Sequence, residues 1–232
     1  MIEHLYTNGC SHTMDYEMRQ QGIKQYADLL SDQNGWTLNN CALPGTCNQR
    51  IIRATVKDAV NFPPNTLALI SLTYLDRTEI GIEQELRASE HPLWHQDYFV
   101  PIKSDGWTGD DQVKSYAKEY YKLFDWYSAF VNLATGVFLL TQLFKQRNIH
   151  YLIFNYNIQL TLSQQAQLQH HAILQELEKD SGVLSIVEDC LTKHIGPGNW
   201  YYDRNTGHFD ESGHAHAARV ITQLINQHVS LV

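Results

Sequence analysis

Short apolar stretches rich in β-forming residues recur along the chain. They cover residues 2–8, 36–42, 66–72 and 149–156, and residues 183–187 form a weaker fifth stretch. The stretches at 66–72 and 149–156 are almost uninterrupted apolar runs, which is typical of strands buried on both faces of a parallel sheet. The pattern therefore predicts a central parallel sheet of about five strands.

Segments with helical spacing of apolar residues lie between these strands. They span residues 21–33, 48–60, about 111–147, 163–180 and 212–228. Asp110 and Asp111 supply an acidic start to the third segment, and Ser163 is the expected N-cap of the fourth. The alternation of strands and helices predicts a three-layer α/β fold with right-handed crossovers.

The long segment at 111–147 carries many aromatic residues, which we expect to form one helix face packed on the sheet. They are Tyr116, Tyr120, Tyr121, Phe124, Trp126, Tyr127 and Phe130. Residues 81–110 break the alternation, since they contain Pro92, Pro101, Gly106 and Gly109 and have no clear periodicity. A segment of this length predicts an ordered, irregular insertion that lines or covers a site, within one domain of residues 1–232.

Composition and charge reduce the number of functions that this chain could have. The chain is 43% apolar and 11% aromatic, as in folded globular proteins. Its net charge is −8 without a cluster of Lys and Arg, which argues against nucleic-acid binding. The first residues lack the basic start of a signal peptide, and no run approaches the roughly 18 apolar residues of a membrane span. We therefore expect a cytoplasmic protein with reduced thiols; the oligomeric state stays open.

The histidines and cysteines do not form a recognisable metal motif. Cys10, Cys41, Cys47 and Cys190 contain no C-x-x-C pair. His91-x-x-x-His95 has the spacing of two ligands on a helix, but Pro92 lies between them and no H-E-x-x-H sequence is present. We expect neither a metal nor a cofactor.

The most informative polar residue is Ser11. The first predicted strand ends in Asn8-Gly9, which predicts a tight turn with Ser11 at its tip, at the edge where α/β sheets bind ligands. A serine becomes a nucleophile only when a base removes its proton and oriented donors hold the oxyanion. His208 lies on a loop before the last helix, and Gly45 precedes a helix that begins near Asn48. Gly45 allows close approach of a ligand to the backbone.

Four segments, in this order, resemble the sequence blocks of the SGNH (GDSL-like) hydrolase superfamily. Gly9-Cys10-Ser11-His12-Thr13 is similar to the Gly-Asp-Ser block, and Gly45-x-x-Asn48 is similar to the glycine block. Residues 73–79 occupy the place of the Gly-x-Asn-Asp block, in a variant that reads Thr73-x-x-x-Arg77-x-Glu79. His208-Phe209-Asp210-x-x-Gly213-His214 is similar to the terminal histidine block. The resemblance implies a flavodoxin-like α/β/α fold.

The resemblance also implies roles for individual residues. Ser11 is the nucleophile and His208 is the base. The remaining residues that the resemblance places in an oxyanion or substrate-binding region are Gly45, Asn48, Thr73, Arg77 and His12. From the residues alone, His12 could equally occupy an exposed loop, and Arg77 could instead pair with Asp76 or Glu79. His214 and His216 are expected to pack in the fold or face solvent rather than to take part in catalysis.

The chain departs from the family pattern at three places. Cys10 replaces the aspartate of the first block, and the oxyanion asparagine of the third block is missing. The acid that usually lies three residues before the histidine is replaced by Asn205. An asparagine can orient an imidazole but cannot stabilise its charged form. Asp203, two residues further back, is therefore the expected third member of the triad.

The function implied is a serine esterase-type hydrolase that acts on an acyl or acetyl ester, for example of a carbohydrate or a lipid. Its partner would be a small-molecule ester substrate. Two alternatives remain on the same fold: a binding protein with a degraded site, favoured by the missing acid, and an acyltransferase. A third possibility is that Cys10 itself is the nucleophile.

Overall fold

The computed structural model describes residues 1–81, 99–103, 111–156, 158, 160–196, 201–203 and 208–229. Most of the predicted insertion at 81–110 lies outside these residues, and so do His91, His95 and Asn205. The backbone of Asp203 is described and its side chain is not.

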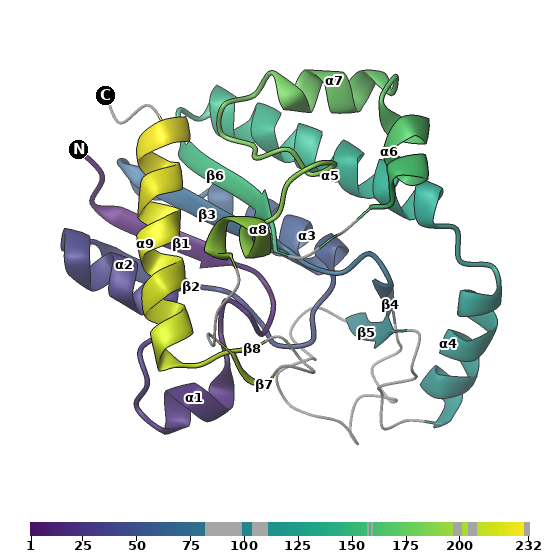
Figure 1. Cartoon of the computed structure of the whole chain (residues 1–232), viewed down its shortest axis with the longest axis horizontal. Helices are drawn as coiled ribbons and strands as arrows, with labels where there is room; N and C mark the ends of the chain where they lie inside the picture. Colours follow the sequence, from purple (N-terminus) through teal and green to yellow (C-terminus); the bar gives the residue numbers. More distant parts are fainter. Residues whose placement is uncertain are drawn as a thin grey trace.

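A parallel four-stranded sheet forms the centre of the fold (Figure 1). Its strands are β1 (His4–Asn8), β2 (Thr37–Asn40), β3 (Thr66–Leu72) and β6 (His150–Asn155), in the order β2-β1-β3-β6. All three pairings are parallel, and every residue of β3 is buried. The predicted α/β fold class is therefore confirmed. The stretch predicted as a fifth strand contributes only one parallel bridge, between Val183 and Ile153 of β6.

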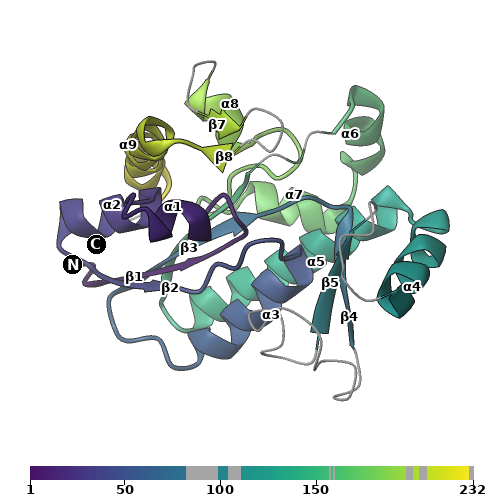
Figure 2. The same ribbon diagram turned by 90° about the horizontal axis from the view of Figure 1, so that it is seen from below.

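Helices cover both faces of the sheet. Figure 2 shows α2 (Tyr26–Asn34) and α9 (Glu211–His228) on one face, and α3 (Asn48–Ala59) and α5 (Trp126–Gln146) on the other. The other helices are α1 (Tyr16–Gln20), α4 (Asp111–Lys122), α6 (Leu162–Leu168), α7 (Ala172–Glu178) and α8 (Leu191–Ile195). The three-layer architecture follows from this arrangement.

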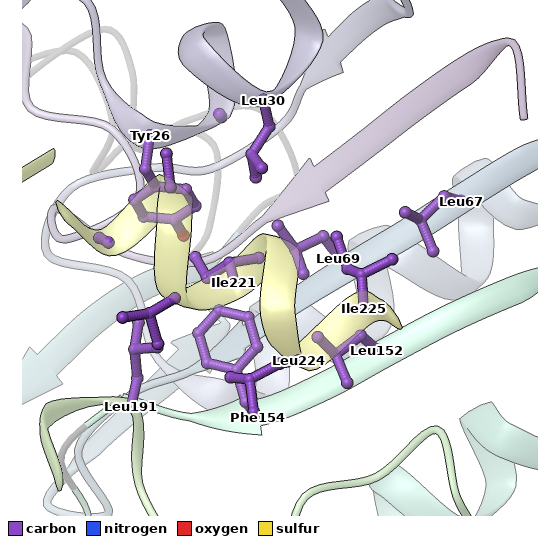
Figure 3. Close-up of a cluster of buried hydrophobic side chains, with 14 of the residues drawn as sticks. Tyr26, Leu30, Leu67, Leu69, Leu152, Phe154, Leu191, Ile221, Leu224 and Ile225 are labelled. Atoms are coloured by element: carbon purple, nitrogen blue, oxygen red, sulfur yellow. The ribbon is translucent and has the colours of Figure 1, made fainter. Parts of the chain in front are cut away.

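Each face of the sheet has its own apolar core. On the α9 face, Ile221 and Ile225 lie against Leu69 of β3 and Phe154 of β6 (Figure 3). On the opposite face, α3 and α5 bury their apolar sides against the other side chains of the same strands. Because β3 and β6 contribute to both cores, their almost continuous apolar sequences are explained.

The long predicted helix at 111–147 is wrong in two respects. It breaks into α4 and α5, because Asp125 accepts hydrogen bonds from the backbone N–H groups of Tyr127 and Ser128 and so caps a new helix. Of the aromatic residues assigned to one sheet-packed face, Phe130 is buried there, whereas Tyr116 is 52% exposed. The segment at 163–180 also divides, into α6 and α7, and Thr161 rather than Ser163 caps α6.

Two small antiparallel hairpins accompany the sheet. One joins β4 (Arg77–Gly81) to β5 (Phe99–Lys103), and α4 packs Val113 and Ala117 on Ile102 of β5. The other joins β7 (Tyr201–Asp203) to β8 (His208–Phe209). The base of the predicted insertion is therefore the β4–β5 hairpin.

Among the described helices, α5 is long and apolar enough to cross a membrane by length and composition. The expectation that no run approaches the length of a membrane span is therefore wrong for this 21-residue helix. Its Leu133, Val137 and Leu140 are buried against the sheet and its neighbours, as in the core helix of a globular fold.

Candidate active site

The candidate site lies at the carboxyl edge of the sheet, where β1 and β3 end side by side. The chain leaves β1 toward α2 on one face, and after β3 it continues through β4, β5 and α4 to α5 on the opposite face, as Figure 2 shows. Such a switch between faces leaves a crevice beyond the strand ends, in which α/β proteins place their ligands. Ser11 and Thr73 follow these two strand ends.

The turn after β1 is held by Asn8 and Gly9. The buried Asn8 amide donates to the backbone oxygen of Ile51 and to Thr55 Oγ1, and its Oδ1 accepts from the N–H of Gly9. A Cβ atom on Gly9 would lie 2.2 Å from Thr13 Oγ1, so only glycine fits here without displacement. These contacts fix the turn that presents Ser11.

Ser11 and His208 meet although 197 positions separate them in the sequence. The distance from Ser11 Oγ to His208 Nε2 is 2.9 Å, within the range of a strong hydrogen bond. His208 is held at the start of β8, next to Phe209, which is 1% exposed and packs against the ring of Tyr156. The sequence-based expectation that these two side chains meet agrees with this geometry.

A carboxylate contacts the other nitrogen of His208. The distance from Nδ1 to Asp15 Oδ2 is 3.0 Å. Asp15 is the N-cap of α1, and its Oδ1 accepts from the N–H groups of Glu17 and Met18 at 2.9 and 3.3 Å. One oxygen is therefore held by the helix terminus while the other faces the imidazole.

The two contacts fit one neutral tautomer of His208. In this tautomer Nδ1–H donates to Asp15, and the lone pair of Nε2 accepts the Ser11 hydroxyl proton. Both Asp15 and Ser11 are therefore satisfied by a single neutral tautomer. This is the relay geometry of a serine, a histidine and a carboxylate.

Asp15 is the residue that sequence reasoning missed. The family pattern favours Asp203 or Asn205, upstream of the histidine, as the acid. The register places the backbone of Asp203 opposite His208 in the β7–β8 hairpin, while its side chain and all of Asn205 lie outside the described residues. The available signal was an aspartate four residues after Ser11, directly before a short helical segment.

The glycine loop is joined to the serine turn by backbone hydrogen bonds. Leu43 N–H donates to the oxygen of Gly9 at 3.0 Å, and Cys41 N–H donates to the oxygen of Thr7. Gly45 has a φ of 74°, in the left-handed region that favours glycine. The loop that carries Gly45 is thereby fixed beside the turn that carries Ser11.

Asn48 joins the glycine loop to the segment after β3. Its amide nitrogen donates to the backbone oxygen of Thr73 at 2.9 Å, and its Oδ1 accepts from the N–H of Thr73 at 2.7 Å. Both polar ends of Asn48 and the N–H of Thr73 are thus used within the protein. These bonds link the glycine loop to the segment after β3, and the oxyanion or substrate contact expected for Asn48 stays a prediction.

A chain of ring contacts leads away from His208. The His12 ring stacks on Tyr156 with centroids 3.7 Å apart, and it meets His208 edge-on at 5.1 Å. The Tyr74 hydroxyl lies 3.4 Å from His12 Nε2. His12 is 2% exposed, so the exposed-loop alternative for it is wrong. Arg77 Cζ lies over the Tyr74 ring, 4.6 Å from its centroid.

Other candidate residues have structural partners. His214 is buried and its Nδ1 accepts from the N–H of Tyr26, in line with the packing role expected for it. His216 contacts the backbone oxygen of Ile195. Within the described ranges no group of three or more His, Cys, Asp or Glu side chains could hold a metal ion.

Comparisons with known proteins agree on the fold. No family model and no curated protein matches the chain. Among solved structures, the psychrotrophic esterase EstA from Pseudoalteromonas sp., inhibited by monoethylphosphonate, has a TM-score of 0.54 and 11% identity, with 97% of each chain covered.

Two further structures align over nearly the whole chain. A candidate lipolytic protein of the G-D-S-L family from Desulfitobacterium hafniense has a TM-score of 0.50 and 8% identity, with 95% of this chain and 98% of that one covered. A candidate SGNH hydrolase from Slackia heliotrinireducens has a TM-score of 0.50 and 11% identity, covering 97% of this chain and 100% of its own. This chain therefore has the fold of the SGNH (GDSL-like) hydrolases.

Proposed function

We propose that this protein is a serine ester hydrolase, with Ser11 as nucleophile, His208 as general base and Asp15 as the orienting acid. The observation that carries the proposal is the continuous contact from Ser11 Oγ to His208 Nε2 and from His208 Nδ1 to Asp15 Oδ2. The fold shared with esterases and lipolytic proteins supports the reaction class.

The reaction proceeds in two acyl-transfer steps. Ser11 Oγ attacks the ester carbonyl while its proton moves to His208 Nε2. The resulting imidazolium then donates that proton to the leaving alcohol, which departs and leaves an acyl group on Ser11. Water attacks the acyl-enzyme with His208 again as base, and the carboxylic acid is released.

The charge that develops on the carbonyl oxygen needs oriented donors. We assign the backbone N–H groups of Ser11 and Gly45 to this role, with a polar group near Thr73, such as the Tyr74 hydroxyl, at the border of the site. Asn48 and Thr73 act as positioning residues, because their hydrogen bonds hold the Tyr74 loop against α3.

Asp15 weakens the case for a degraded binding protein. That alternative rested on the missing acid upstream of His208. With a carboxylate 3.0 Å from Nδ1, each chemical role of a serine hydrolase has a candidate residue. The acyl or acetyl ester substrate is retained from the resemblance to the family.

A covalent probe and a chromogenic ester test the proposal together. The wild-type protein should be labelled by a fluorophosphonate and should hydrolyse short-chain para-nitrophenyl esters. Ser11→Ala should abolish labelling, and His208→Ala should lower turnover by a factor on the order of 10³ or more. A folded wild-type protein that neither reacts with the probe nor hydrolyses any ester would refute the proposal.

A further inference from the structure

The positive charge of Arg77 has no acidic partner among the described residues. Its Nη1 donates a long hydrogen bond of 3.4 Å to Thr73 Oγ1, and its guanidinium lies over the Tyr74 ring. Every carboxylate in the described part of the chain is more than 4 Å from its guanidinium nitrogens. Most of its five N–H donors are therefore available.

Arg53, in contrast to Arg77, has an acidic partner. Its guanidinium binds Glu79 through two hydrogen bonds of 3.2 and 2.8 Å, and it lies 4.2 Å from the centroid of the Phe99 ring. Glu79 was one of the two acids expected to neutralise Arg77, and it is used by Arg53 instead. The pairing of Arg77 with Glu79 is therefore wrong.

Arg77 is connected to the catalytic centre by side-chain contacts. Its guanidinium stacks on Tyr74, the Tyr74 hydroxyl contacts His12, and the His12 ring meets the His208 ring edge-on. Arg77 is also half-buried, and burying a charged group without a partner costs free energy. An anionic ligand would supply the missing partner.

On these observations we propose that Arg77 binds an oxyanion carried by the substrate, so that the site selects esters that bear a carboxylate or phosphate group. This inference rests on the proposed esterase function and names its substrate class. A guanidinium suits the role because its planar donors bind a carboxylate or phosphate through two parallel hydrogen bonds.

The preference is measured with matched esters. Mono-para-nitrophenyl glutarate carries a carboxylate on its acyl chain, and para-nitrophenyl pentanoate has the same number of acyl carbons without the charge. For an anion on the alcohol side, para-acetoxybenzoate is compared with its methyl ester, and para-acetoxyphenyl phosphate provides a phosphate. The wild-type protein should favour the charged member of at least one pair in kcat/KM.

Arg77→Gln should lower that preference by about tenfold to a hundredfold, mostly through a higher KM, and Arg77→Lys should retain part of it. Arg147→Gln is the charge-matched control, because Arg147 binds the backbone oxygen of Val60 away from the candidate site. Added salt should reduce the wild-type preference. Thermal unfolding of each variant checks that it is folded.

A binding measurement separates this inference from the esterase proposal. Monoethyl glutarate and monoethyl phosphate are titrated calorimetrically into the Ser11→Ala protein, with and without Arg77→Gln. If no ester is hydrolysed but Arg77→Gln abolishes binding, the anion site stands and the esterase proposal fails. If esters are hydrolysed with no charge preference, or Arg77→Gln leaves both preference and binding unchanged, the anion site is overturned and the esterase proposal survives.

Discussion

At the scale of single residues, Asp15 performs two tasks with its two carboxylate oxygens. One oxygen caps α1 through the N–H groups of Glu17 and Met18, and the other contacts His208. The capping task needs only an oxygen acceptor, which asparagine also supplies. The proposed catalytic task needs the negative charge, because an imidazolium forms next to it. The two tasks can therefore be separated by one substitution.

Asp15→Asn should preserve folding and reduce activity. We expect thermal stability within a few degrees of wild type, since asparagine caps helices about as well as aspartate. We expect kcat to fall by a factor on the order of 10²–10⁴, as for loss of the acid from a serine triad. Steady-state hydrolysis of a short-chain para-nitrophenyl ester measures the effect.

Asp203→Asn is the matched control for this prediction, because Asp203 is the residue that the family pattern favours. If Asp15 is the acid, the Asp203 variant keeps most of the wild-type kcat. Full activity in Asp15→Asn together with a large loss in Asp203→Asn would reverse our assignment.

The site residues differ in how far the sequence could locate them. Ser11 and His208 were predictable because each lies in a short block with a known order along the chain. Asp15 was not, because its role depends on α1 turning back toward β8, and the five-residue α1 was not predicted. The partner of Asn48 could not be predicted either, since hydrogen bonds between segments far apart in the sequence leave no periodic signal.

At the scale of elements, hydrophobic spacing located the main sheet-packed helices but missed the breaks within long helical segments. Residues 48–60 match α3, and residues 66–72 match β3. The division between α4 and α5 was missed because apolar residues continue through it, while the break depends on the cap at Asp125. Local hydrogen bonding overrode the hydrophobic pattern.

The junction between α3 and the segment after β3 is an element-scale target. Asn48→Ala removes two strong hydrogen bonds to Thr73, at 2.9 and 2.7 Å, in a buried setting. We expect a loss of about 2–4 kcal/mol in the free energy of unfolding, because the Thr73 N–H and oxygen lose their partners. Denaturant unfolding measures this loss.

Activity gives a second readout for the same variant. Displacement of the Tyr74 loop should also lower kcat/KM. Gln49→Ala is the control, since Gln49 lies next in α3 and is exposed, and its one bond to Thr78 is long at 3.2 Å. Equal stability and activity of the two variants would contradict a positioning role for Asn48.

At the scale of the whole molecule, the alternation of strands and helices was sufficient to predict a parallel sheet between two helical layers. This succeeded because burial on both faces of the sheet imposes long apolar runs on β3 and β6. The number of strands was less secure. Residues 183–187 are apolar, yet only Val183 forms a bridge to β6.

The packing of α9 against α2 makes stability depend on pH through His214. Burial lowers the pKa of His214 to about 4, below the value of about 6.5 expected in the unfolded chain. As pH falls from about 6.5 to about 4, the unfolded state takes up a proton that the folded state does not, so the free energy of unfolding falls by up to roughly 3 kcal/mol.

His214→Asn should remove this part of the pH dependence. Asparagine keeps an oxygen that can accept the Tyr26 N–H bond, and it does not titrate. Denaturant unfolding at about pH 7 and about pH 4.5 compares wild type, His214→Asn and the exposed-site control His170→Asn. Parallel losses of stability on acidification in all three proteins would argue against His214 as the source.

The short distance in sequence between Ser11 and Asp15 has a consequence for when activity arises. Nucleophile and carboxylate form one local unit near the start of the chain, whereas the base comes from residue 208. Because ribosomes make the amino end first, the proposed triad stays incomplete until the segment with β8 has been synthesised and has packed into the fold. The proposed hydrolysis would therefore begin only after the fold is complete, and a partly synthesised chain would be inactive.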